Sequence, residues 1–245
     1  DTGGVSKNVF KWNNQSFTNL YASKIGLDNN LEAPKRFDNK INSKFHESTP
    51  VFTKDGKTMY FTRNNFLNGK RGKDSKSVTL LKMYKSTLVD GQWANIAELP
   101  FNSDNYSVAH PALSLDEKTL YFASDMPGTL GQSDLFKVTI NENGTYSTPE
   151  NLGAKINTEG RETFPTISAE NELYFASDGR PGLGGLDIYV TRLDENQNIG
   201  EIQNIGEPVN SPKDDFSFLI DSETRKGFFT SNRDGGKGFD DIYKF

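Results

Sequence analysis

Residues 134–165, DLFKVTINENGTYSTPENLGAKINTEGRETFP, lie over residues 19–50, NLYASKIGLDNNLEAPKRFDNKINSKFHESTP, without a gap. Each stretch starts with an apolar-aromatic pair, carries an Ile-Asn-Ser/Thr triplet and ends on proline. Two distant segments that share one template indicate an internal repeat, and a period near 50 residues is typical of propeller blades or solenoid units.

Four sequence marks recur along the whole chain with a spacing of about 53 residues. An aromatic pair occurs at Tyr60-Phe61, Tyr121-Phe122, Tyr174-Phe175 and Phe228-Phe229. An Asp-apolar-aromatic triplet occurs at 134–136, 187–189 and 241–243, with degenerate forms at 19–21 and 82–84. An apolar-Asn-Ser/Thr triplet occurs at 41–43, 101–103, 156–158 and 209–211. A short strand begins at Pro50, Pro111, Pro165 and, in the last copy, Ser217.

Turn signals separate these marks, for example Asp90-Gly91 and Asn143-Gly144, and each is flanked by alternating apolar residues. Such signals indicate hairpins. One unit is therefore predicted to contain four strands, at 50–53, 58–63, 82–88 and 93–97. Four antiparallel strands per repeat of this length predict the blade of an all-β propeller.

The repeat count predicts five blades in one domain, residues 1–245. The predicted blades cover about 48–98, 110–152, 164–204 and 216–245, with a partial first blade at 1–36. Because Asp1-Thr2-Gly3-Gly4 resembles a loop of later copies, the first blade is predicted to be truncated at its N-terminus. A segment upstream would then supply the missing strands.

The composition excludes some classes of function. The net charge of −5 removes the basis for non-specific nucleic-acid binding. The chain has no cysteine, so disulfides and thiolate metal sites are excluded. No stretch is long and apolar enough for direct membrane insertion, and no cofactor motif is found.

The pattern PxhSxDxKxLYFxS followed by DhYxh, seen at residues 111–124, resembles the WD40-like Pro-Asp repeat of TolB-type propellers. Residues 1–7 and 15–21, the Asn triplets and the Ser124-Asp125 and Ser177-Asp178 loops resemble the propeller region of Bacteroidota PorE-type, OmpA-family proteins. This second resemblance implies a periplasmic, outer-membrane-associated role in a type IX secretion or gliding-like assembly. It also implies that peptidoglycan is bound only by a separate domain of such proteins.

Enzymatic readings have little support from the residues. The nucleophile motif GxSxG is absent, and two histidines leave few ways to form a Ser/His/Asp triad. A five-bladed carbohydrate-binding or glycoside-hydrolase-like propeller remains the alternative, and it would need axial carboxylates such as Glu47 or Glu162. Calcium could suit the Asp/Gly loops at 178–187 and 232–241, but their Asp residues are expected to accept backbone N–H bonds instead, so no metal site is predicted.

The sequence therefore predicts a non-enzymatic module that binds a protein partner of a cell-envelope complex. Loops that precede the first strand of each blade differ between copies, so the face that carries them, with the long loop 63–80, is the predicted binding surface. Its candidate residues are His46, Glu47, Arg63, Phe66, Leu67, Arg71, His110, Arg161, Glu162, Lys213 and Asp214.

Overall fold

The computed structural model describes residues 9–10, 15–26 and 30–245. These residues form strands, turns and loops, and none of them is helical. The predicted all-β fold is therefore confirmed. The predictions for residues 1–7, including the likeness of Asp1–Gly4 to a later loop, lie outside the described residues.

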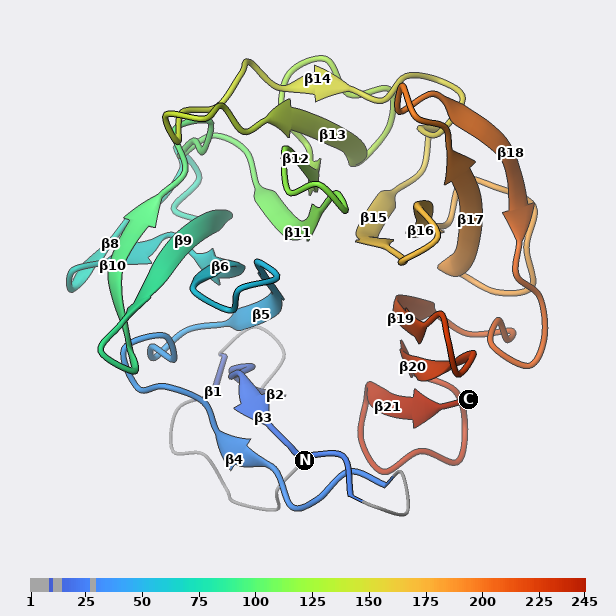
Figure 1. The fold of residues 1–245 in the computed structure, drawn as a ribbon, viewed down its shortest axis with the longest axis horizontal. Helices are drawn as coiled ribbons and strands as arrows, with labels where there is room; N and C mark the ends of the chain where they lie inside the picture. Colours follow the sequence, from blue (N-terminus) through green and yellow to red (C-terminus); the bar gives the residue numbers. More distant parts are fainter. Residues whose placement is uncertain (1–8, 11–14, 27–29) are drawn as a thin grey trace.

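Four antiparallel sheets are arranged around a central axis (Figure 1). The first contains β5 (Glu47–Phe52), β6 (Thr58–Asn64), β9 (Leu81–Val89) and β10 (Gln92–Glu98). The second contains β11 (Val108–Leu113), β12 (Thr119–Ser124), β13 (Asp134–Thr139) and β14 (Glu150–Asn151). The third contains β15 (Glu162–Ile167), β16 (Glu172–Ser177), β17 (Asp187–Leu193) and β18 (Ile199–Asn204). The fourth contains β19 (Asp215–Asp221), β20 (Lys226–Ser231) and β21 (Asp241–Lys244).

The predicted number of five blades is wrong for the described residues, which form four blade sheets. The first repeat contributes only the pair β3 (Tyr21–Ala22) and β4 (Lys35–Arg36). A second short pair joins β1 (Val9–Phe10) to β2 (Gln15–Ser16). Two-residue ladders bury too little surface to form a blade, because a stable sheet needs three or more strands with an apolar face.

The innermost strand of every blade carries a bulge that the sequence did not reveal. In the first sheet this strand begins at Glu47 rather than Pro50, and its register shifts between Ser48 and Val51. The bulge places one non-glycine residue of each inner strand at positive φ, namely Thr49 (46°), His110 (58°), Phe164 (49°) and Ser217 (54°). This conformation is uncommon for residues that carry a Cβ. In the fourth sheet Phe218 stands where the other strands have proline, one residue later than predicted.

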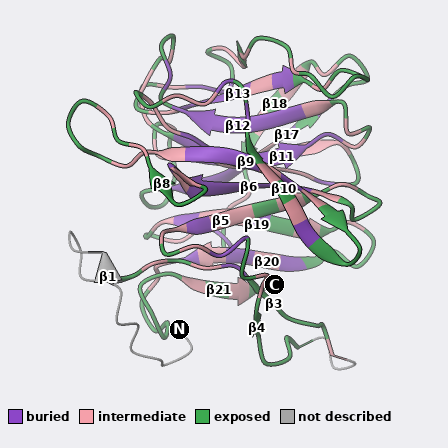
Figure 2. Ribbon diagram, turned by 90° about the vertical axis from the view of Figure 1, so that its left-hand side faces the viewer, coloured by how far each residue is buried: buried purple, intermediate pink, exposed green. Residues whose placement is uncertain are grey.

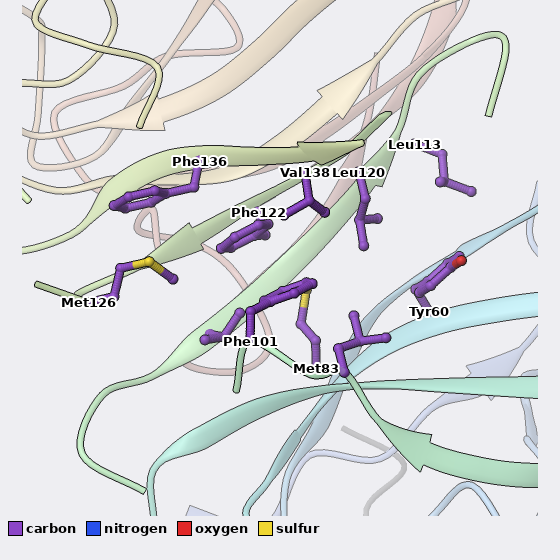
Figure 3. Close-up of a cluster of buried hydrophobic side chains, with 11 residues drawn as sticks. Tyr60, Met83, Phe101, Leu113, Leu120, Phe122, Met126, Phe136 and Val138 are labelled. Carbon is purple, nitrogen blue, oxygen red and sulfur yellow. The ribbon is translucent and has the colours of Figure 1, made fainter. Parts of the chain in front are cut away.

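The core lies between neighbouring sheets. Figure 3 shows the cluster where the first two sheets meet, with Phe122 and Phe136 of the second sheet facing Met83 and Phe101. Phe101 and Phe122 stack with ring centroids 4.9 Å apart. In Figure 2 buried segments follow the middle strands, such as β6, β9 and β12, whereas the loops are exposed. Burial of each such aromatic ring contributes about 2–3 kcal/mol.

The repeated asparagine closes the first three blade sheets, and the first repeat, by a clamp of two hydrogen bonds. In the third sheet, Asn210 Oδ1 accepts from Ile188 N at 2.8 Å and its Nδ2 donates to Ile188 O at 2.9 Å. The same clamp joins Asn157 to Leu135, Asn102 to Met83 and Asn42 to Leu20. A side chain thus continues the sheet where the outer strand has ended, which explains why asparagine recurs at this place.

The repeated aspartate fixes the loop before the third strand of a blade. Asp187 Oδ2 accepts from Leu183 N and Gly184 N at 2.9 and 3.1 Å. Asp241 Oδ2 accepts from Lys237 N and Gly238 N at 2.6 and 2.8 Å. The expected role of these residues as acceptors of backbone N–H bonds is confirmed.

Candidate functional site

Glu47 and Arg63, predicted on the exposed face, are interior residues, with 1% and 3% of their surfaces exposed. Arg63 Nε lies 3.1 Å from Glu47 Oε1, and the guanidinium also donates to the Ile41 carbonyl. Burial raises the pKa of Glu47, while Ser43 and Arg63 act in the opposite direction. This pair joins the start of β5 to the end of β6, so it belongs to the framework.

Two further arginines repeat the arrangement around Arg63. Arg180 donates to the Ile156 carbonyl at 2.9 Å, and Arg233 donates to the carbonyls of Pro208 and Val209. Each of the three guanidinium groups lies over two aromatic rings of its own sheet, at 4.8 to 5.9 Å from the ring centroids. All three arginines donate to the carbonyl of the residue that precedes a clamping asparagine. They therefore stabilise the contact between consecutive repeats, which is called the blade seam below.

The other buried carboxylates at the start of inner strands are also held by the framework. Glu162, fully buried, accepts from Thr158 N and Oγ1 at 2.7 Å each and from Ser177 Oγ at 2.6 Å. Asp215 accepts from Ser211 N and from Arg233 Nη2, both at 2.6 Å. The prediction of Glu162 as an exposed residue is therefore corrected. The prediction for Glu162 rested on a charged residue at a position that varies between blades. A buried, hydrogen-bonded carboxylate produces the same sequence pattern.

The remaining polar candidates of the later blades lie in surface loops and have local partners. Arg161, exposed, pairs with Asp178 at 2.7 Å between Nε and Oδ2. Lys213, exposed, pairs with Asp234 at 3.2 Å. Asp214 accepts from Leu186 N at 2.9 Å and thereby connects two loops of neighbouring blades. These contacts connect the loops at one end of the propeller.

A cavity of about 230 Å³ lies on the axis, between the inner strands β5, β11, β15 and β19. Its lining is mainly apolar and contains no carboxylate. The lining residues are Thr49, Pro50, Val51, His110, Pro111, Ala112, Leu113, Phe164, Pro165, Thr166, Ile167, Ser217 and Leu219. Of the predicted site residues, His110 alone belongs to this lining.

The rings of His110, Phe164 and Phe216 form a row beside this cavity. His110 stacks on Phe164 with centroids 3.8 Å apart and planes 12° apart, and Phe216 follows at 4.7 Å from Phe164. His110 Nδ1 lies 2.7 Å from Thr163 Oγ1. Burial lowers the pKa of His110 to about 3, so its ring is neutral at physiological pH. No sequence pattern separates Phe164 and Phe216 from aromatic residues of the core.

A second group, the aromatic rim cluster, consists of Phe17, Phe45, Phe66, His46, Lys44 and Arg71. The centroid distances are 5.8 Å between Phe17 and Phe45, 5.0 Å between Phe45 and Phe66, and 4.7 Å between Phe17 and His46. Lys44 lies over the rings of Phe45 and Phe66, and Arg71 over Phe45, at 5.4 to 5.7 Å. His46, Phe66 and Arg71 were predicted here. Phe17 was missed because it comes from a distant segment, and Lys44 and Phe45 were missed although they directly precede His46.

The long loop 63–80 contains a short β-hairpin. Its first half is the hairpin of β7 (Phe66–Leu67) and β8 (Lys70–Arg71), which turns at Asn68 and Gly69 with φ of 50° and 80°. Leu67 packs against the buried cluster of Ile41, Phe61 and Tyr84. This contact anchors the hairpin, in which Phe66 and Leu67 are half-buried and Arg71 is exposed.

Other classes of site find no support in the part of the chain that the structure describes. Within it, no three histidine or acidic side chains come close enough together to hold a metal ion. The described residues also contain no helix of the length and apolarity that a membrane crossing needs.

Comparison with known proteins gives the fold. No family model and no curated protein matches the chain. TolB from Acinetobacter baumannii is similar in structure, with a TM-score of 0.53 and 13% identity over 87% of this chain and 43% of TolB. The α-L-arabinofuranosidase from Lactobacillus brevis has a TM-score of 0.52 and 14% identity over 88% of this chain and 77% of the enzyme. The chain thus spans less than half of the TolB chain, and at such identities the likeness concerns the fold alone. We conclude that the chain has a TolB-like β-propeller fold.

Proposed function

We propose that the chain is a non-enzymatic module that binds a protein partner through the aromatic rim cluster. The observation that carries this proposal is the gathering of three aromatic rings with Lys44 and Arg71 at one end of the propeller. Rings combined with arginine at a partly exposed place are characteristic of the energetic centres of protein interfaces.

The charges of the cluster suggest the chemistry of the partner. Among the described residues, neither Lys44 nor Arg71 takes part in an ion pair, although seven such pairs are present elsewhere. Both cations instead lie over aromatic rings. A partner that places a carboxylate beside an apolar side chain would complement this surface, because the cations and the rings would then be used together.

The non-enzymatic part of the proposal is supported by the position of the carboxylates. Glycoside hydrolysis uses two carboxyl groups that flank the substrate bond. No carboxylate lines the axial cavity, and Glu47 and Glu162 are hydrogen-bonded within the framework. The row of rings beside the cavity favours a second candidate, the binding of a carbohydrate or another small ligand without turnover.

The cellular location is also part of the proposal. The sequence resemblance to PorE-type proteins supports a periplasmic, outer-membrane-associated complex of the secretion or gliding type. In such a complex the propeller would contact protein, while peptidoglycan would be bound by another domain. The TolB-like fold is compatible with this placement.

Capture of partners from solubilised cell envelopes of the source organism tests the proposal. The tagged chain would be compared with a Phe66→Ser/Arg71→Glu variant and with a control, Lys213→Glu, in an exposed loop of another blade. We expect the double variant to lose at least about tenfold in recovery of one protein, since loss of two interface centres costs 2 kcal/mol or more. Equal recovery by all three folded proteins would contradict the proposal.

A further inference from the structure

The wall of the axial cavity is built from a backbone feature that all four inner strands share. The residue at positive φ in each strand, namely Thr49, His110, Phe164 and Ser217, belongs to the lining. Residues that carry a Cβ are strained in this conformation, and such strain gathers at ligand sites. The strained positions of four blades therefore meet around one cavity on the axis.

The row of aromatic rings ends at this cavity. Phe164 contacts a ring of each neighbouring blade, His110 at 3.8 Å and Phe216 at 4.7 Å between centroids. Among the described residues, His110 stacks on Phe164 alone, and it lines the cavity. The equivalent residue of the first inner strand is the small Thr49, so this blade adds no ring to the row. One more flat ring would continue the row within the cavity.

The cavity offers few polar groups to a ligand. No charged side chain belongs to its described lining, since burial keeps the His110 ring neutral. Thr49 Oγ1 lies 3.0 Å from Thr62 Oγ1, and Thr166 Oγ1 donates to the Phe218 carbonyl at 2.7 Å. The hydroxyl groups of both lining threonines are therefore already paired within the protein.

Two polar side-chain atoms of the lining are left for a ligand. His110 Nδ1 lies 2.7 Å from Thr163 Oγ1, but His110 Nε2 and Ser217 Oγ make no hydrogen bond among the described residues. A sugar carries a hydroxyl group on most of its carbon atoms, and each buried hydroxyl without a partner is costly. An ion would lose its hydration without gaining a counter-charge. The lining therefore favours a neutral ligand with one or two polar atoms.

The volume of the cavity limits the size of the ligand. Because a dry apolar cavity of about 150 Å³ can bind benzene, a cavity of about 230 Å³ suits two fused rings. We propose that the axial cavity binds a small, neutral, two-ring aromatic compound, with one of its rings stacked on His110. This proposal rests on the second candidate function, ligand binding at the axis, and is independent of the aromatic rim cluster.

Titration calorimetry with indole tests the class of ligand. Indole is neutral, has two fused rings and carries one N–H group, and we expect it to bind with a Kd below about 1 mM. The comparison probes are indole-3-acetate, which adds a carboxylate, and glucose, which has hydroxyl groups in place of the rings. Each should bind at least about tenfold more weakly than indole. A Kd for indole above about 1 mM, or equal binding of either comparison probe, would overturn the proposal.

Two Leu→Trp variants locate the bound indole. Leu219 lines the cavity and is exposed, so Leu219→Trp should fold and should bind indole at least about tenfold more weakly, because the added ring occupies part of the cavity. Leu130→Trp, at an exposed residue outside the lining, is the matched control and should bind indole as the native chain does. Equal binding by the two variants would place indole elsewhere and would overturn the proposal.

Two further variants separate stacking on His110 from binding at the rim. His110→Gln removes the ring, and it should weaken indole binding about threefold to tenfold, the range expected for one ring contact. The Phe66→Ser/Arg71→Glu variant should bind indole as the native chain does. Unchanged indole binding by His110→Gln would overturn the stacked arrangement. Partner capture by a native chain that binds no indole would contradict this inference alone, and indole binding without partner capture would contradict only the rim proposal.

Discussion

The first two blades build the contact at the end of their second strand from opposite chemistry, with Arg63 in the first blade and Met126, two residues beyond the equivalent Ser124, in the second. At the first, Arg63 and Glu47 form a buried ion pair beneath Phe61. At the second, Met126 packs with Phe101 and Phe122, and Val108 stands where Glu47 does (Figure 3). A charged residue at the loop end of a blade can therefore serve the packing between blades, and by itself it does not indicate a binding partner.

The largest effect is expected when the two chemistries are mixed. Arg63→Met should lower the free energy of unfolding by about 3–5 kcal/mol, because it leaves the buried Glu47 carboxylate without its cation. Adding Glu47→Val, which removes the buried carboxylate and places the residue type of Val108 there, should recover most of this loss. Urea denaturation measures both variants, and a double variant as unstable as the single one would refute the equivalence of the seams.

The asparagine clamp is common to both kinds of seam, so its removal should cost about the same in each. Asn157→Ala removes both hydrogen bonds to the buried Leu135 and should lower the free energy of unfolding by about 2–4 kcal/mol. Asn196→Ala, in an exposed hairpin, is the control and should cost less than about 0.5 kcal/mol. Thermal and urea unfolding would check the pair, and equal costs would argue against the clamp.

The row of rings at the axis adds a dependence on pH. The pKa of His110 is about 3 in the folded chain and about 6.5 when unfolded, so the unfolded state binds the proton first as pH falls. Stability contributed by the neutral ring is present above about pH 6.5 and is lost progressively toward pH 3. Between pH 7 and pH 5 the native chain should lose about 1–2 kcal/mol more than His110→Gln does. Parallel pH profiles for the two proteins would exclude this role.

The smallest effect on stability is expected at the rim, where a cation has no framework partner. Arg71→Glu should change the free energy of unfolding by less than about 1 kcal/mol, since Arg71 is exposed and its guanidinium lies over the ring of Phe45 at the surface. Comparison with Arg63→Met by the same denaturation assay sharpens the distinction between seam and rim. A cost for Arg71→Glu near that of Arg63→Met would place Arg71 in the framework.

The repeat marks determined the all-β architecture from the sequence alone, because strand periodicity, turn residues and a fixed spacing are local properties of the chain. The role of Asp187 and Asp241 as acceptors within turns was also local, and it was predicted correctly. The number of blades was not predicted correctly, because a repeat that retains its sequence marks can still lack the strands that make a sheet.

Burial and assembly of the site were decided by the tertiary structure. From the sequence, Glu47, Arg63 and Glu162 were predicted to be exposed charged residues. In the folded propeller they are buried and bonded to neighbouring strands and loops. Phe17, Phe45 and Phe66 stand far apart in the chain and meet only because the first repeat packs beside the long loop. Such contacts between distant segments leave no local pattern, so sequence could name the face of the propeller but not the side chains that gather on it.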